Sequence, residues 1–373
     1  MGMNTDFIKL LANHMENRPF EVQVTQELKM LAQNHQLSPI VYYQTKDDTF
    51  RLSYLQAINV YTQRKALLDQ IIEAFSDIPY YIVKGLNVSK YYPIPQLRTM
   101  GDCDIIVHES DKERAKQILL SLGFKETTGE WDDMEWHFQK QGFDFELHHR
   151  LLYDEAVNTE QEVEFTSKAW YYVKNNELDV NFHFVFLLLH LKKHFLNRGV
   201  GIRQFMDLAL MSINAELNRE RIEAFLQQAG IKKFAGVCSA LCLRWFGVAF
   251  PVDTPEIPDE FYDTATVTIL SNGVFGFNVP IDEEKQLLNN VKKSGKAGTI
   301  LAHLFPSYKI CCSTPKYRWI KGKPYLLPVL WIYRLFSALL NGKGKTSAKY
   351  VTAVANSHNA MVERDEYLSN WGL

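Results

Sequence analysis

The chain has few cysteines, and their arrangement builds neither a covalent nor a metal framework. Its 373 residues include five cysteines, an odd number without the paired spacing of zinc ligands, so we expect reduced thiols rather than disulfides. The formal net charge of −2 leaves no positive excess that would attract nucleic acid to the whole protein. These deficits argue against a disulfide-built secreted domain and favour a small-molecule or protein substrate over DNA or RNA.

The sequence also has no uninterrupted apolar run suited to a transmembrane helix. Its most apolar stretch, 325–340, is short and contains Pro328 and Arg334. The first residues lack the basic and apolar regions of a signal peptide, and no repeat or low-complexity tract is evident. With 46% hydrophobic and 23% charged residues, we expect a cytoplasmic globular protein long enough for more than one core.

Residues 80–107 are the most informative part of the chain. The run 80–83, Tyr-Tyr-Ile-Val, predicts a short strand, and a second strand is predicted at 105–107, directly after Asp102 and Asp104. Because alternate side chains of a strand share a face, the two carboxylates project together while Cys103 points to the other side. Neighbouring carboxylates repel one another, and a divalent cation bound through oxygen relieves the repulsion. A two-metal phosphoryl-transfer site requires such a pair.

A further acidic strand is predicted downstream. Segment 139–149 has a turn at Gly142 and then alternates apolar and polar residues. Asp144, Glu146 and His148 fall on one of its faces. If this strand lies beside the first acidic strand, Glu146 or Asp144 can supply a third carboxylate.

These segments together resemble the polymerase-β-like nucleotidyltransferase superfamily, and most closely its uncharacterised bacterial branch. The matching features are Lys84-Gly85, Tyr92-Pro93, Arg98, Gly101-Asp102-Cys103-Asp104 and Glu146-Leu147-His148. The resemblance implies an α+β fold in which a small mixed β-sheet is flanked by N-terminal and C-terminal helical domains. It also implies that Asp102 and Asp104 bind two Mg²⁺ ions and that Glu146, in preference to Asp144, completes the metal site.

The resemblance further implies a triphosphate-binding region beside the metals. Gly85 would let backbone amides approach the phosphates, and Gly101 belongs to the same nucleotide site. Lys84 and Arg98 are the candidates for holding the β and γ phosphates, Arg98 being suited to a bidentate grip. The chain departs from the superfamily pattern at Leu86, where a second Gly or Ser usually follows the glycine.

Two helices predicted beyond residue 180 carry the remaining candidate residues. His190 and His194 recur at helical spacing beside Lys193, and after a glycine-bearing break a second helix has Arg203 and Asp207 one turn apart. The same bacterial branch contains these motifs, so the resemblance covers 79–246.

The helical residues could take part in binding in several ways. Lys193 or Arg203 could contact the triphosphate, and His190 or His194 could hydrogen-bond the acceptor or the ribose. A zinc pair formed by the two histidines is disfavoured because no third ligand stands at a recognised spacing. We expect Asp207 to orient Arg203.

We divide the chain into an N-terminal helical region (1–78), a catalytic core (79–152), a helical domain facing the active site (153–250) and a mostly helical C-terminal region (251–373). Within the core, the acidic pair at 132–133 is interpreted as a solvated hairpin tip. Segment 309–345 contains eight Lys or Arg residues and no Asp or Glu, interleaved with aromatic residues. It is interpreted as a buried docking helix with a basic flank, or as a peripheral contact with an anionic membrane surface.

The sequence therefore predicts an Mg²⁺-dependent nucleotidyltransferase. We expect it to transfer a nucleoside monophosphate, AMP from ATP, to an unidentified small-molecule or protein acceptor, with pyrophosphate as the leaving group. The alternative is a catalytically inactive nucleotide-binding or membrane-associated adaptor protein. A metal-dependent phosphohydrolase is disfavoured, since the acidic strand has no supporting His-Asp pair.

Overall fold

The protein folds into two compact units. In this computed structural model, one unit comprises Met1–Asn278 together with Trp371–Leu373, and the other comprises Val279–Asn370. The residues that the structure describes are 2–127, 135–152, 158–197, 199–273, 298, 305–308, 311, 317, 320, 322–340 and 367–373. The predicted hairpin tip at 132–133 and parts of segment 309–345 lie outside the described residues.

The elements of the first unit fall into three successive groups. The chain begins with α1 (Gly2–Met15), α2 (Gln26–Asn34), α3 (Ser38–Thr45), η1 (Asp48–Phe50) and α4 (Arg51–Ala74). The sheet region contains β1 (Tyr80–Val83), α5 (Gly85–Ser89), η2 (Pro95–Leu97), β2 (Asp104–Val107), η3 (Glu109–Asp111), α6 (Lys112–Ser121), β3 (Lys125–Glu126), β4 (Glu135–Lys140) and β5 (Phe143–His148). The third group contains α7 (Glu160–Ser167), η4 (Ala169–Tyr172), β6 (Val173–Lys174), β7 (Glu177–Leu178), α8 (Val180–Asn197), α9 (Ile202–Asn214), α10 (Arg219–Ala229), α11 (Lys232–Phe246) and α12 (Asp259–Asn272).

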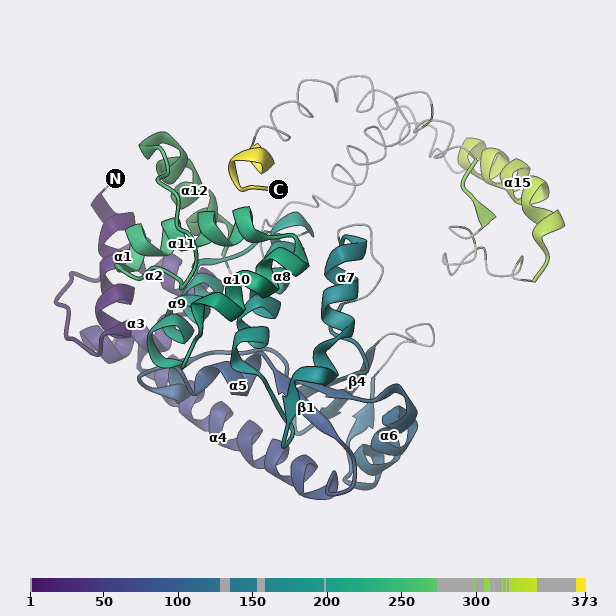
Figure 1. Ribbon diagram of the computed structural model, residues 1–373, viewed down its shortest axis with the longest axis horizontal. Helices are drawn as coiled ribbons and strands as arrows, with labels where there is room; N and C mark the ends of the chain where they lie inside the picture. Colours follow the sequence, from purple (N-terminus) through teal and green to yellow (C-terminus); the bar gives the residue numbers. More distant parts are fainter. Residues whose placement is uncertain are drawn as a thin grey trace. The chain divides into compact units, whose positions relative to one another are not determined.

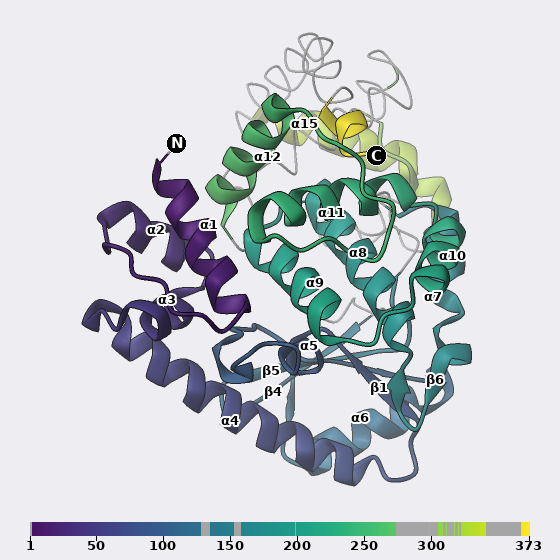
Figure 2. The same ribbon diagram turned by 60° about the vertical axis from the view of Figure 1, so that its left-hand side comes forward.

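The main sheet is mixed and has the order β1-β2-β5-β4-β3. The pairing of β2 with β5 is parallel, whereas the β1–β2, β5–β4 and β4–β3 pairs are antiparallel. Helices α4 and α6 lie against one face, and α8 to α11 are stacked beyond the other (Figures 1 and 2). The prediction of an α+β fold with a small mixed sheet is confirmed. The second face of the sheet looks toward α8 and α9.

One face of the sheet forms a hydrophobic core with α4 and α6. Cys103, Ile105 and Val107 are fully or almost fully buried in this core, which also contains Leu67 and Ile71 of α4. Strand alternation turns the residues between them to the opposite face. The apolar side chains of β2 therefore anchor the strand in the core, while Asp102 and Asp104 project from its opposite face into the cleft described below.

The helical layer of the first unit is closed by an aromatic cluster. Trp371 is completely buried, and its ring lies 4.5 Å from that of Phe195 in α8, measured between centroids. The rings of Phe205, Phe234 and Phe261 also contact it, from α9, α11 and α12. Residues near position 371 are thus part of the core of the first unit.

The described part of the second unit is small. It contains η6 (Pro324–Leu326) and α15 (Leu327–Leu340), with a core made of Cys311, Ile320 and Leu330. No helix in the described part of the chain has the length and apolarity needed to cross a lipid bilayer.

Candidate active site

A cleft of about 600 Å³ lies between the open face of the sheet and helices α8 and α9. Its sheet side carries acidic groups, and its helical side and connecting loops carry basic ones. The lining residues with ionisable side chains are Lys84, Arg98, Asp102, Asp104, Glu135, Glu146, His148, Arg150, His190, Lys193, His194, Arg203 and Asp207. The cleft therefore brings together, from separate parts of the sequence, nearly all the residues predicted above.

The acidic wall is created by the register of two parallel strands. Asp104, the first residue of β2, lies directly across from Glu146 of β5, and Ile106 lies across from His148. Asp102 precedes β2 and also lines the cleft. Asp144, the alternative third acid, is exposed on β5 and accepts a hydrogen bond from Gln139 of β4 at 3.0 Å. The structure thus places Glu146, not Asp144, beside Asp104.

Asp104 is buried and paired with cations. Its Oδ1 lies 2.5 Å from Lys84 Nζ and 3.3 Å from His148 Nε2. Burial alone would raise the pKa of this carboxyl, but the attraction of Lys84 and the hydrogen bond from His148 outweigh it and lower the pKa to about 2. Asp104 is therefore an anion at every physiological pH.

His148 is a site residue that the sequence analysis did not assign. Its Nε2 lies 3.2 Å from Glu146 Oε2 in addition to its contact with Asp104. Burial would lower the pKa of this imidazole, but hydrogen bonds to the two carboxylates raise it to about 9. The sequence could have indicated that His148 belongs to the site, because it shares a strand face with Glu146, two residues earlier.

The pKa of Asp102 is raised, in contrast to that of Asp104. Burial raises its pKa, repulsion from Asp104 and Glu146 adds to the increase, and Lys84 partly offsets it. Carboxylates this close together cannot all be charged without cations nearby. The acidic wall is a place where a divalent cation would lower the free energy.

The turn between β1 and α5 is held in an unusual conformation. Lys84 and Gly85 have φ values of +57° and +40°, a region that residues other than glycine seldom adopt. A Cβ atom on Gly85 would lie 3.1 Å from the carbonyl oxygen of Asp102. The backbone N–H of Lys84 donates to Nε2 of His183 in α8 at 3.4 Å. Gly85 thus lets the turn approach the aspartate segment closely, and His183 steadies it.

Leu86, the departure from the superfamily pattern, points away from this turn. It is partly buried and packs against the hydrophobic core between the sheet and α4.

All three nitrogen atoms of the Arg98 guanidinium donate hydrogen bonds to protein groups. Its Nε and Nη2 donate to the two oxygens of Asp207 at 2.8 Å each, and Nη1 donates to the carbonyl of Gly85 at 3.1 Å. Asp207 also accepts from the hydroxyl of Tyr92 at 2.7 Å. Asp207 therefore pairs with Arg98 and not with Arg203 as predicted, because the loop brings Arg98 to α9 from more than one hundred residues upstream. Arg98 lines the cleft, and its predicted contact with phosphate stays a prediction.

Two further arginines hold the backbone that leads into β2. Arg203 of α9 donates from Nη1 to the Thr99 carbonyl at 3.0 Å and to Gln36 Oε1 at 3.1 Å, while its buried Nε has no partner. Arg64 of α4 donates to the carbonyls of Met100 and Gly101 at 2.8 and 2.9 Å. The segment before Asp102 is thus clamped from both sides. Arg64 was not assigned from the sequence, because its partners are backbone atoms more than thirty positions away.

Helix α8 contributes a polar edge to the other wall. Nε2 of His190 lies 2.9 Å from Nε2 of His194, so one ring donates and the other accepts. Burial and the nearby Lys84 lower the pKa of His190 well below its ordinary value. Lys193 lines the same wall. The structure places these three residues in the cleft, where the sequence analysis expected nucleotide or acceptor contacts.

The acidic residues fit the divalent metal that the resemblance implies. Asp104 Oδ2 is buried and has no hydrogen-bond partner, which leaves one carboxylate oxygen of the pair available. Asp104, Glu146 and His148 each place a possible ligand atom within 4.8 Å of the other two. Asp102, at the same cleft, would add a further oxygen ligand of the kind that Mg²⁺ prefers.

The chain matches a known protein family. A protein-family model described as "Uncharacterised nucleotidyltransferase" matches residues 23–247, which is more than half of the chain. No curated protein and no solved structure matches the chain. The matched range contains the whole cleft and also α2 to α4.

Proposed function

Because the chain belongs to the nucleotidyltransferase family whose model matches residues 23–247, we propose that it transfers a nucleoside monophosphate from an NTP to an acceptor hydroxyl. ATP is the expected donor, and the acceptor is a small molecule or a protein. The observation that carries this proposal is the register of β2 and β5, which sets Asp104 directly opposite Glu146 in a cleft with a basic far wall.

The proposed reaction exchanges one phosphorus–oxygen bond for another. The acceptor oxygen attacks the α-phosphorus, a new P–O bond forms, and the bond between the α-phosphorus and its bridging oxygen to the β-phosphate breaks, so that pyrophosphate leaves. Bound Mg²⁺ would supply charge neutralisation at the α-phosphate and would increase the acidity of the attacking hydroxyl.

The side chains of the protein have separate roles in this proposal. Asp102, Asp104 and Glu146 would hold the metal ions, and Glu146 would also orient the acceptor hydroxyl or accept its proton. Lys193 and Arg203 would face the β and γ phosphates and stabilise the charge that develops on pyrophosphate. Lys84 is the remaining candidate phosphate ligand, because its ammonium lies at the edge of the same carboxylates.

Ligand binding tests the metal and nucleotide parts of the proposal together. Thermal denaturation would be followed with ATP, GTP, CTP and UTP, each with and without Mg²⁺. We expect the melting temperature to rise when both the metal and one triphosphate are present. The rise should disappear in Glu146→Gln and remain in Asp144→Asn, which alters an exposed acid on the same strand two residues away. Stabilisation that does not need metal, or that survives Glu146→Gln, would contradict the proposed site.

A transfer assay separates an enzyme from an inert nucleotide-binding protein. The protein would be incubated with α-³²P-labelled NTP, Mg²⁺ and fractions of small molecules and proteins from a bacterial extract. Label transferred to an acceptor with matching pyrophosphate release is the expected result, and Asp104→Asn should abolish both. Nucleotide binding without either product would support the adaptor alternative.

A further inference from the structure

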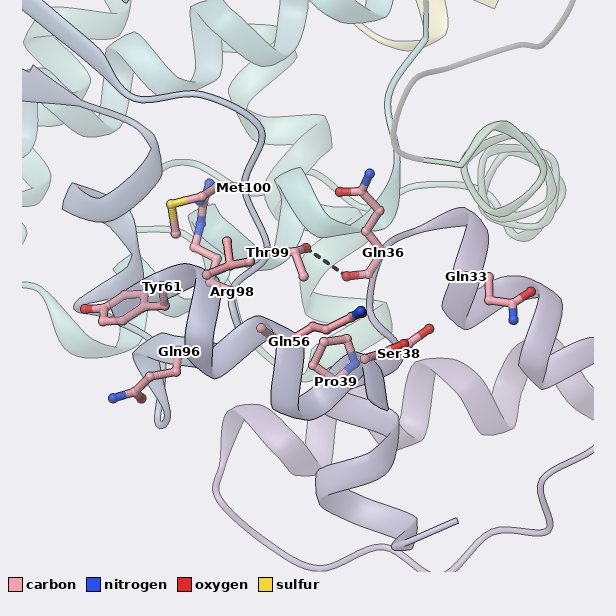
Figure 3. A pocket seen from close by; sticks show the side chains of 13 residues that line it. Gln33, Gln36, Ser38, Pro39, Gln56, Tyr61, Gln96, Arg98, Thr99 and Met100 are labelled. Carbon is pink, nitrogen blue, oxygen red and sulfur yellow. Dashed lines mark hydrogen bonds between the residues drawn. The ribbon is translucent and has the colours of Figure 1, made fainter. Parts of the chain in front are cut away.

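A second cavity, of about 380 Å³, lies beside the active-site cleft. One wall is a stripe of α4, and the others come from the start of α3, the end of α2 with the residues after it, and the loop before β2. The α4 stripe consists of Ser53, Gln56, Ala57, Val60 and Tyr61, which recur at the three- and four-residue spacing of one helix face. Figure 3 shows Tyr61 and Gln96 at one end of this cavity and Gln33 at the other.

The chemistry of this cavity differs from that of the cleft. Of its 13 lining residues only Arg98 carries a full charge, and that guanidinium is bound to Asp207 and Gly85. The other polar groups are hydroxyls and the amides of four glutamines, and carbon atoms provide most of the lining surface between them. A charged ligand would lose water here without gaining a counterion. The cavity therefore suits an uncharged ligand with many hydrogen-bonding groups.

The cavity and the cleft share a wall. Arg98 and Met100 line both. Thr99 between them donates from its hydroxyl to the Gln36 carbonyl at 2.8 Å, as Figure 3 shows, and Arg203 joins Thr99 to Gln36 from the cleft side. A ligand in the cavity would lie along the backbone segment that ends at the metal-binding carboxylates.

We propose that this cavity binds the uncharged, polyhydroxylated part of the acceptor, a sugar. The assignment rests on the proposed function, since a transferase needs a second substrate site next to the donor site. A glutamine amide donates and accepts at once, which matches the paired hydroxyls of a sugar, and Tyr61 offers an apolar ring face beside them. A nucleobase fits less well, because Tyr61 is the single aromatic side chain among the lining residues and no second ring closes a planar slot.

Two variants on one helix isolate the cavity. Ala57→Trp fills it, whereas Ala66→Trp places the same side chain on an exposed position of α4 outside it. A milder pair is Gln56→Ala in the cavity and Gln63→Ala on the exposed surface. The milder pair keeps the test valid if the tryptophan variant does not fold.

Saturation-transfer difference NMR would measure binding of a mixture of neutral methyl glycosides and of the four ribonucleosides, without metal or triphosphate. We expect glycoside signals in the wild type and in Ala66→Trp, and signals about fivefold weaker or absent in Ala57→Trp. Gln56→Ala should weaken the signals and Gln63→Ala should not. The same preparations would be tested for thermal stabilisation by Mg²⁺ and NTP, which all four variants should retain.

Each other outcome overturns a defined part of the inference. Absence of glycoside binding, or binding that Ala57→Trp leaves intact, overturns the cavity assignment while an intact Mg²⁺–NTP response leaves the proposed function standing. Nucleoside signals that Ala57→Trp removes would make the cavity a base site and also overturn the assignment. Glycoside binding in the cavity without any Mg²⁺–NTP response would overturn the acceptor role together with the proposed function.

Discussion

Asp207→Asn tests the buried ion pair that joins the loop before β2 to α9. The substitution keeps the shape of the side chain and removes the charge that balances Arg98, which is only 7% exposed. Three hydrogen bonds end on this carboxylate, two from Arg98 and one from Tyr92. Removing one partner of a buried pair leaves the other charge uncompensated, and we expect the free energy of unfolding to fall by about 3–5 kcal/mol.

The measurement is urea unfolding followed by circular dichroism, with the midpoint compared at constant slope. A triple variant, Arg98→Met with Asp207→Leu and Tyr92→Phe, replaces the pair and the hydroxyl bonded to it by apolar groups. It should recover most of the loss, because desolvation of two charges is avoided and no buried hydroxyl is left without a partner. Asp253→Asn is the matched control, since Asp253 pairs with Arg219 at 2.6 Å on an exposed surface, where we expect no measurable change. A loss below about 1 kcal/mol for Asp207→Asn, or a triple variant as unstable as the single one, would show that the charge of Asp207 does not stabilise the fold by balancing Arg98.

Three further predictions concern the backbone turn, the clamp on the aspartate segment and acid stability. Gly85→Ala should cost about 1–2 kcal/mol in chemical unfolding because of its positive φ and the approach of Asp102, whereas Gly101→Ala, whose Cβ would meet nothing within 4 Å, should be close to neutral; equal effects would contradict the strain argument. Arg64→Met removes two charged hydrogen bonds and should cost roughly 2–3 kcal/mol and also weaken the Mg²⁺–NTP thermal response; an unchanged response would show that the clamp does not position Asp102. Burial lowers the pKa of His14 to about 4, below the ordinary 6.5, so its contribution to stability is complete above pH 6.5 and is lost as the pH falls toward 4. Between pH 7.5 and 5 the wild type should therefore lose about 2 kcal/mol more than His14→Phe in urea unfolding, and parallel pH profiles would exclude this role.

The strand pattern predicted the acidic wall better than any other part of the site. Alternation along β2 separated Asp104 from Cys103, and the structure has Cys103 in the core and Asp104 in the cleft. The choice between Glu146 and Asp144 could not be made from alternation, because both lie on one face of β5. The choice depends on the register with β2, a long-range pairing that the residues of β5 alone do not determine.

The partners of the basic residues were less predictable. The four-residue spacing of Arg203 and Asp207 indicates a helical pair, but such a contact contributes only about 0.2–0.5 kcal/mol. The buried bidentate contact between Asp207 and Arg98 is stronger, so Asp207 pairs with Arg98 instead of Arg203. Arg64 and His183 bind backbone atoms of distant segments. Residue type and spacing in the sequence therefore do not predict these contacts. The amide-lined cavity likewise appears only when four separate segments meet.

The burial of Trp371 gives the chain an unusual connectivity. Residues 279–370 leave the first unit after position 278, and the chain returns to it at position 371, so the second unit is an insertion attached at both of its ends. A recombinant protein that stopped at the end of the family match, at 247, would lack Trp371 and expose the rings of Phe195 and Phe234 to water. A smaller protein that keeps the cleft should therefore retain 371–373 and be made by internal deletion within 279–370, rather than by truncation at 247.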